Sequence, residues 1–203
     1  MKIVCIGRNY ADHARELGNQ IPEEPVLFIK PDSAQYPHKN YYIPDFTKEL
    51  HYECELVIRI DRVGKHIQPE YAHTYYSQVT LGIDFTARDL QNALKSKGLP
   101  WEKAKGFDGA AVVGTFIPKE AIGDINNTDF YFYIDGQLRQ HGQTSQMLYS
   151  VDQLISYISR FFTLKKGDLI FTGTPAGVGL VMPGMKLKGI LATHPVLELT
   201  IKG

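Results

Sequence analysis

Two glutamates, Glu53 and Glu55, flank a single cysteine and together could bind a metal ion. They lie in HYECEL, residues 51–56, part of an alternating segment typical of a β-strand. Residues i and i+2 of a strand project from the same face, roughly 7 Å apart. Two carboxylates at that spacing repel each other unless a cation lies between them. Mg²⁺ accepts such oxygen ligands, and GIDFTARD could supply a third carboxylate from Asp84 or Asp89.

Two further segments carry side chains or backbone groups suited to catalysis. In NYADHARE, His13 and Glu16 are three residues apart on a predicted helix, so they share a face. A carboxylate beside an imidazole raises its basicity, and the pair could activate water. In FTGTPAGVG, 171–179, backbone N–H and hydroxyl groups could bind a carboxylate or an enolate oxygen. This segment lacks the lysine of a P-loop and no helical pattern follows it, so we do not predict a nucleotide site.

Each of these patterns also has an ordinary structural explanation. Glu53 and Glu55 could lie on a solvated sheet face near Arg59. His13 and Glu16 could form a surface pair, and a plain turn after a strand would account for 171–179. No one pattern therefore identifies a site.

Short alternating segments dominate the chain and predict a mainly β protein with a few helices (α+β), arranged around a sheet or a barrel-like core. The predicted strands span 2–7, 25–31, 50–61, 79–87 and 168–175, with one or two more in 186–202. A hairpin is expected over 129–142, around Asp135-Gly136. The predicted helices span 9–17, 69–78, 88–98 and 150–164, the last with Ser150 as its N-cap. The segment 32–48 is interpreted as a loop.

Composition limits the class of protein. The 203 residues are enough for one sizeable domain or two small ones, and with 43% apolar residues they can form a substantial core. Lysine plus arginine equals aspartate plus glutamate, 22 each, which argues against nucleic acid or an anionic membrane as a partner. Cys5 and Cys54 are interpreted as buried thiols of a reducing compartment. Neither a signal peptide nor a bilayer-length apolar stretch is visible, so we expect a soluble, cytoplasmic protein.

Taken together, the motifs resemble those of a known family. The order of GRNYADH, EPVLFIKP, the ExE strand, DFTARDLQ, KGLPWEKAKGFD and GTPAGVG resembles the fumarylacetoacetate hydrolase family, from about Lys2 to the C-terminus. The chain looks most like the short branch that includes acylpyruvases and oxaloacetate decarboxylases. The resemblance implies a mixed β-roll, one catalytic domain over 1–203 and assembly as a homodimer. Because the chain begins almost at the first motif, we expect no organellar leader.

The resemblance also implies a set of site residues. A divalent metal, Mg²⁺ or Mn²⁺ with Ca²⁺ as a substitute, would be bound by Glu53, Glu55 and Asp84, whereas Asp89 matches a different family position. The catalytic residues would be the His13–Glu16 dyad of a lid helix and Lys105. The positions that match substrate-binding residues are Arg8, Lys30, Gln91 and Thr174.

The implied reaction is C–C bond cleavage of a small 2-oxo acid through a metal-stabilised enolate. It could be acylpyruvate hydrolysis, with His13 as the base for water, or oxaloacetate decarboxylation, which needs no water; Lys105 would add positive charge near the enolate. An alternative is an isomerase or dehydratase acting on an unsaturated or sugar-derived 2-oxo acid, such as a 2-hydroxyhepta-2,4-diene-1,7-dioate isomerase. A non-catalytic metal-binding protein is a third class, against which the complete dyad argues.

Overall fold

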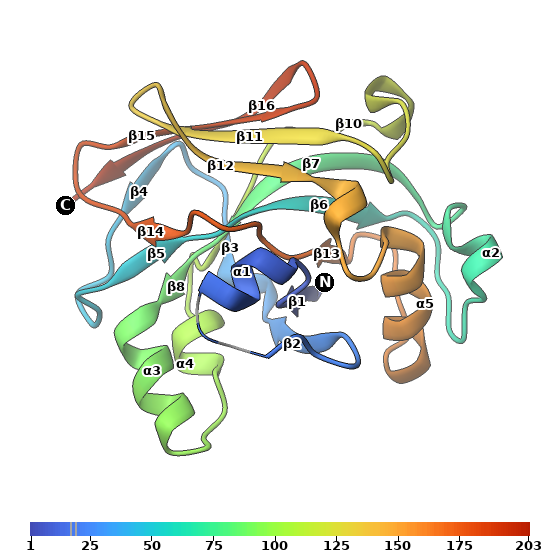
Figure 1. Cartoon of the computed structure of the whole chain (residues 1–203), viewed down its shortest axis with the longest axis horizontal. Coiled ribbons are helices and arrows are strands. Elements are labelled where there is room, and N and C mark those ends of the chain that lie inside the picture. Colours follow the sequence, from blue (N-terminus) through green and yellow to red (C-terminus); the bar gives the residue numbers. More distant parts are fainter. Residues whose placement is uncertain (17, 19) are drawn as a thin grey trace.

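Strands form most of the regular structure in the computed structural model, which describes residues 1–16, 18 and 20–203 (Figure 1). These residues form three sheets, two of mixed strand direction and one antiparallel, so the predicted mainly β, α+β class is confirmed. The eight-stranded sheet has the order β2-β1-β13-β6-β7-β9-β3, with β10 also paired to β7. Its strands are β1 (Ile3–Gly7), β2 (Val26–Lys30), β3 (Gln35–Tyr36), β6 (Cys54–Ile60), β7 (Tyr76–Asp84), β9 (Ala111–Val113), β10 (Ile117–Pro118) and β13 (Leu169–Phe171).

Two smaller sheets complete the β structure. The five-stranded sheet has the order β12-β11-β15-β16-β4, and the three-stranded sheet has the order β14-β5-β8. Their strands are β4 (Asn40–Tyr42), β5 (Leu50–Tyr52), β8 (Thr86–Ala87), β11 (Asp129–Ile134), β12 (Gln137–Gln143), β14 (Gly179–Leu180), β15 (Lys186–Leu191) and β16 (His194–Lys202). In the view of Figure 1, β11, β15 and β16 lie above β6 and β7 of the large sheet. One continuous apolar core contains side chains from both, among them Leu56, Leu81, Phe130 and Leu197.

The helices are short, and all but the first lie at the margins of the sheets in the view of Figure 1. They are α1 (Ala11–Glu16), α2 (Pro69–Ala72), α3 (Arg88–Ser96), α4 (Glu102–Lys105), α5 (Val151–Phe161) and the 3₁₀ turns η1 (Asp32–Ala34), η2 (Lys119–Ile122) and η3 (Thr144–Gln146). Leu17, the last residue of the predicted helix 9–17, lies outside the described residues. Ser150 caps α5 as predicted, in a capping box with Gln153. Among the described residues, no helix is long and apolar enough to cross a membrane.

Some predictions from local pattern were confirmed. The hairpin β11–β12 turns at Asp135 and Gly136, whose φ angles of 51° and 79° suit a two-residue turn. Cys5 and Cys54 are buried free thiols, as expected.

Other predictions were wrong in part, each because a partner distant in sequence decides the structure. The predicted loop 32–48 contains β3 and β4, which pair in parallel with β9 and β16. The predicted helix 69–78 ends early, because the chain from Tyr76 pairs with β6 as the start of β7. The predicted strand 79–87 is interrupted after Asp84, and Thr86–Ala87 pairs with β5 in another sheet.

The predicted strand 50–61 is also broken, at Glu53. Leu50–Tyr52 belongs to the three-stranded sheet and Cys54–Ile60 to the eight-stranded sheet. The carbonyl of Glu53 accepts a hydrogen bond from the Asp84 backbone N–H, at 2.8 Å. The end of β7 therefore lies beside the start of β6.

Candidate active site

Three buried carboxylates converge where β5 gives way to β6 and where β7 ends. Glu53, Glu55 and Asp84 are 5%, 1% and 1% exposed, and one carboxylate oxygen from each lies within 4.8 Å of the others. The β6–β7 ladder brings them together, because Cys54 lies opposite Ile83 and Glu55 opposite Gly82. The alternative of a solvated sheet face near Arg59 is therefore wrong; that guanidinium packs over Phe116, 4.6 Å from the ring centroid.

Basic side chains surround two of the three carboxylates. Lys105 Nζ lies 2.8 Å from both Glu53 Oε2 and Asp84 Oδ2 and donates to Thr86 Oγ1 at 2.7 Å. Arg88 lies 2.5 Å from Glu53 Oε1, and Lys30 Nζ lies 2.7 Å from Asp84 Oδ1. Three cations thus contact Glu53 and Asp84 in a site with three carboxylates.

Glu55 has a different environment. It accepts a hydrogen bond from the Gly173 N–H at 2.8 Å, and no lysine or arginine of the described chain forms an ion pair with it. Burial, followed by repulsion from Asp84 and Glu53, raises the pKa of Glu55 well above its usual value. This carboxyl group therefore lacks the positive charge that its two neighbours have.

The pKa values of Glu53 and Lys105 are both shifted so that the charged form is favoured. Burial by itself would raise the pKa of Glu53, but the positive charges of Lys105 and Arg88 outweigh it and lower that pKa. Burial would lower the pKa of Lys105, yet the negative charges of Asp84 and Glu53 raise it overall. Glu53 and Lys105 are consequently held as a charged pair across the neutral pH range.

The predicted dyad lies at the same pocket. His13, on α1, is 5% exposed, and its Nδ1 lies 3.3 Å from Glu16 Oε2. Glu16 is one-third exposed and accepts the Gly177 N–H, at 3.1 and 3.2 Å from its two oxygens. Because His13 is buried and lines the pocket, an ordinary surface pair does not describe these two residues.

The glycine-rich turn 171–179 forms hydrogen bonds mainly with the backbone of β6. Thr172 donates from its N–H and its hydroxyl to the Leu56 carbonyl, and Thr174 donates its hydroxyl to the Cys54 carbonyl at 2.8 Å. At Gly173, φ is 102° and a Cβ would lie 2.7 Å from the Asn9 Cβ, so only glycine fits. The Thr172, Gly173 and Gly177 N–H groups thus donate within the protein, whereas Thr174 lines the pocket, so substrate binding by this segment stays a prediction.

The pocket itself has an empty volume of about 470 Å³, part of which is open to solvent. Among the residues matched to substrate binding, Arg8, Gln91 and Thr174 line it. Lys30 is not among the described lining residues; its ammonium contacts Asp84 and donates to the Lys105 carbonyl behind the site. Arg8 has a φ of 61°, a strained conformation for a residue with a side chain and one often found at functional sites.

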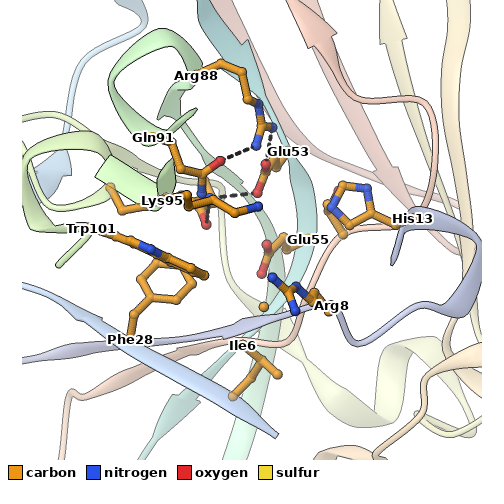
Figure 2. A pocket seen from close by; sticks show the side chains of 14 residues that line it. Ile6, Arg8, His13, Phe28, Glu53, Glu55, Arg88, Gln91, Lys95 and Trp101 are labelled. Carbon is orange, nitrogen blue, oxygen red and sulfur yellow. Dashed lines mark hydrogen bonds and ion pairs between the residues drawn. The ribbon is translucent and has the colours of Figure 1, made fainter. Parts of the chain in front are cut away.

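Sequence reasoning did not single out four residues that line this pocket. Arg88 donates to the Gln91 side chain at 2.6 Å as well as contacting Glu53 (Figure 2). Phe28 and Trp101 form an aromatic wall, with ring centroids 6.2 Å apart, across the pocket from His13 (Figure 2). Lys95, on α3, also lines it. Only the motifs DFTARDLQ and KGLPWEKAK pointed to this region, without showing which side chains face inward.

Asp89, the other aspartate considered as a third ligand, lies outside the cluster. It accepts hydrogen bonds from the Thr47 hydroxyl at 2.7 Å and from the Lys48 N–H at 3.0 Å. These bonds lower the pKa of Asp89 although burial acts to raise it. Asp89 is thus occupied in fixing the loop before β5 onto α3.

Similarity to known proteins extends over nearly the whole chain. The family model described as fumarylacetoacetate (FAA) hydrolase C-terminal matches residues 2–203. A mitochondrial oxaloacetate decarboxylase from Dictyostelium discoideum is 47% identical over 189 residues, 92% of this chain and 87% of that protein. The oxaloacetate tautomerase FAHD1, mitochondrial, from Homo sapiens is 41% identical over 201 residues, 98% of this chain and 90% of that protein.

Solved structures share the fold. A fumarylpyruvate hydrolase from Pseudomonas aeruginosa, in complex with Mn²⁺ and pyruvate, superposes with a TM-score of 0.94 at 38% identity, covering 100% of this chain and 89% of that one. A 5-carboxymethyl-2-hydroxymuconate delta-isomerase from Mycobacterium smegmatis superposes with a TM-score of 0.86 at 33% identity, covering 99% and 78%. The same fold thus occurs in structures titled as a hydrolase and as an isomerase.

Proposed function

The chain belongs to the fumarylacetoacetate hydrolase family, and from this premise we propose that it cleaves a C–C bond of a small 2-oxo acid with the help of a divalent cation. The reaction is acylpyruvate hydrolysis, oxaloacetate decarboxylation or both. One observation carries the proposal: three buried carboxylates converge beside Lys105 at a pocket that His13 also lines. The relatives named for oxaloacetate and for fumarylpyruvate support this class of substrate.

The residues present fit a hard divalent cation. Three carboxylate oxygens within 4.8 Å form the oxygen donor set that Mg²⁺ and Mn²⁺ prefer, and Ca²⁺ could substitute. The buried Glu55 carboxyl, which lacks a lysine or arginine partner among the described residues, is the feature that most needs a positive charge. Glu53, Glu55 and Asp84 would hold the cation, and a related solved structure is in complex with Mn²⁺. Bound there, it would supply Lewis acidity to the carboxylate and 2-oxo oxygens of the substrate.

Lys105 stabilises negative charge on the substrate in this proposal. When the C3–C4 bond breaks, its electron pair passes into the 2-oxo group and forms an enolate. The Lys105 ammonium stays protonated, because Asp84 and Glu53 raise its pKa, and it is held at 2.8 Å from both carboxylates. A fixed positive charge in a buried pocket favours such an anionic intermediate.

His13 and Glu16 provide the base for hydrolysis. His13 takes a proton from water, and the hydroxide attacks the C4 carbonyl of the acylpyruvate. Glu16 contacts Nδ1, so it orients the ring and stabilises the imidazolium that forms. Decarboxylation requires no such attack, because CO₂ leaves and the enolate is protonated.

The remaining predicted residues position the substrate or the charges around it. Arg8 and Gln91 line the pocket and could bind substrate oxygens, and Thr174 lies beside them. Lys30 is better placed to balance the charge of Asp84 than to contact the substrate.

An isomerase is the second candidate function. Its support is the isomerase from Mycobacterium smegmatis with the same fold and the relatives named oxaloacetate tautomerases. The same carboxylates and His13 could move a proton between carbon and oxygen without breaking a C–C bond. A dehydratase acting on a sugar-derived 2-oxo acid would use the same base to remove a proton from carbon, while the neighbouring hydroxyl group is protonated and leaves as water.

A substrate panel tests the proposal. Acylpyruvates, oxaloacetate and unsaturated 2-oxo diacids are each incubated with the protein and Mg²⁺, and separately with a chelator, and the products are identified. We expect pyruvate, with a carboxylic acid or CO₂, only when Mg²⁺ is present. Isomerised substrate without cleavage would select the second function, and no Mg²⁺-dependent product from any substrate would contradict both.

The domain, assembly and location expected from the sequence belong to the same proposal. We expect residues 1–203 to act as one catalytic domain and to form a homodimer. The free thiols Cys5 and Cys54 fit a reducing compartment; the sequence predicts the cytoplasm, whereas curated relatives are named mitochondrial. Fractionation of cells that express the natural, full-length protein distinguishes the two compartments.

A further inference from the structure

A buried glutamine, Gln140, lies behind the carboxylate cluster. It belongs to β12, a strand of the hairpin whose residues 137–139 are exposed, yet its own exposed fraction is 1%. A buried amide without hydrogen bonds would destabilise the fold. Gln140 avoids this because its carbonyl oxygen and its amide nitrogen both form hydrogen bonds.

Three hydrogen bonds form a closed ring around Cys54, the residue between Glu53 and Glu55. The Cys54 N–H donates to Gln140 Oε1 at 3.0 Å. Gln140 Nε2 donates to Thr174 Oγ1 at 2.8 Å, and the Thr174 hydroxyl donates to the Cys54 carbonyl at 2.8 Å. Both backbone polar groups of Cys54 are therefore held by side chains from two other segments.

Gln140 also contacts the loop that holds the dyad. Its Nε2 donates to the Pro175 carbonyl at 2.8 Å. Two residues further on, a Cβ at Gly177 would lie 2.3 Å from the Arg139 carbonyl oxygen, so the loop packs directly on β12. The N–H of Gly177 donates to Glu16. One glutamine thus links the segment with Glu53 and Glu55 to the loop that binds Glu16.

We propose that Gln140 is a positioning residue for the metal-binding carboxylates. At the break between β5 and β6, the ring around Cys54 fixes the backbone from which Glu53 and Glu55 project toward Asp84. Groups that orient metal ligands in this way typically change metal affinity 10- to 100-fold when they are removed. The inference rests on the proposed metal site and assigns Gln140 no contact with the substrate.

Binding of Mn²⁺ alone, measured by titration calorimetry, tests the inference without using activity. Gln140→Met keeps the length of the side chain and removes all its hydrogen bonds. We expect its Kd for Mn²⁺ to rise about 10- to 100-fold. The matched control is Gln143→Met in the same strand, whose side-chain amide donates to the exposed Asn127; its Kd should equal that of the unmodified chain. If Gln140→Met lowers Tm but binds Mn²⁺ normally, Gln140 is merely structural and the inference is overturned.

Substitutions of Thr174 test the role of the ring independently if Gln140→Met does not fold. Thr174→Val removes the hydroxyl from the ring, and Thr174→Ser restores it. We expect weaker Mn²⁺ binding in the valine variant and recovery in the serine variant; equal affinity in both overturns the inference. The double variant Gln140→Met/Thr174→Val should bind no more weakly than the weaker single variant, since both break one ring, and additive losses contradict the ring.

The same titration separates this inference from the proposed function. If the unmodified chain does not bind Mn²⁺, the metal site itself is wrong and both are overturned. If it binds Mn²⁺ and both Gln140→Met and Thr174→Val bind it equally well, only the role of Gln140 is overturned.

Discussion

Glu53 and Glu55 are two residues apart on the same segment, but their surroundings differ. Glu53 contacts Lys105 and Arg88, whereas Glu55 accepts a backbone N–H and, among the described residues, pairs with no lysine or arginine. Removing one partner of a buried ion pair is strongly destabilising, because a buried charge is left without compensation. Removing a buried carboxyl that is repelled by its neighbours relieves that repulsion. The two glutamates should therefore respond differently to the same substitution.

Replacing either glutamate with glutamine should weaken Mg²⁺ binding more than about tenfold, since each loses a ligand charge. Glu53→Gln should also lower the free energy of unfolding of the metal-free protein by roughly 3 kcal/mol. Glu55→Gln should leave that free energy unchanged or slightly higher. Calorimetric Mg²⁺ titration and urea unfolding in chelator measure the two effects. Unchanged Mg²⁺ binding in both variants would rule out the three-carboxylate site.

The dyad and Lys105 should separate the two proposed reactions. His13→Ala removes the base for water and should reduce kcat/KM for an acylpyruvate roughly 10²- to 10⁴-fold, with a much smaller loss for oxaloacetate. Lys105→Ala should reduce both, because both reactions pass through the enolate. The measurement is kcat/KM of each variant on both substrates at fixed Mg²⁺. Equal losses in His13→Ala would assign the dyad to lid closure or enolate protonation.

Among the elements, the parallel pair β1–β13 leads into segments that contribute Arg8 and Thr174 to the pocket. Arg8 follows β1, and Gly173 and Thr174 follow β13, so the ends of two neighbouring strands supply them. Asp168 joins the opposite ends of the pair: it accepts the Lys2 N–H at 3.0 Å and the Lys165 N–H at 2.8 Å and also binds the Lys2 ammonium. Burial acts to raise the pKa of Asp168, but these interactions outweigh it and lower that pKa.

Asp168→Asn should therefore lower stability in a pH-dependent way. A carboxylate whose pKa is lower in the folded state stabilises the protein above its unfolded pKa of about 3.9, and the stabilisation is lost as the pH falls through the lower, folded-state value. We expect the variant to be about 1–3 kcal/mol less stable at pH 7, from the loss of hydrogen bonds to a charged group. Urea unfolding from pH 7 to pH 2 measures this; a difference that does not shrink below pH 3.9 would contradict the assignment.

At the scale of the whole molecule, assembly is the main prediction. The chain has no formal net charge, so electrostatic repulsion between copies is weak. Large apolar side chains such as Tyr42, Leu138 and Met182 are exposed and could be buried between two copies. Light scattering at micromolar concentration should give twice the chain mass of 22.9 kDa. A single species at the mass of one chain would contradict the homodimer.

The sequence by itself determined the mainly β class, the Asp135-Gly136 hairpin, the capped helix α5 and the candidate carboxylates. These depend on short-range physics: strand alternation, the backbone preferences of glycine and aspartate at a turn, and a serine hydroxyl at a helix start. The spacing of Glu53 and Glu55 predicted that both would reach one site, and both carboxylates do lie in the same cluster although the strand is broken at Glu53. That local regularity is why the pair could be identified before its surroundings were known.

Only the tertiary structure decided which groups surround the carboxylates. Lys105 is 52 residues from Glu53, and Gln140 is 86 residues from Cys54, so no local pattern links them. For the same reason β4 was predicted as part of a loop, since its partner β16 lies near the other end of the chain. Periodicity reports which side of a segment is buried, because burial follows from the alternation of side chains. It does not report which distant groups lie against that side. In this fold those groups are two cations beside Glu53 and a backbone amide beside Glu55.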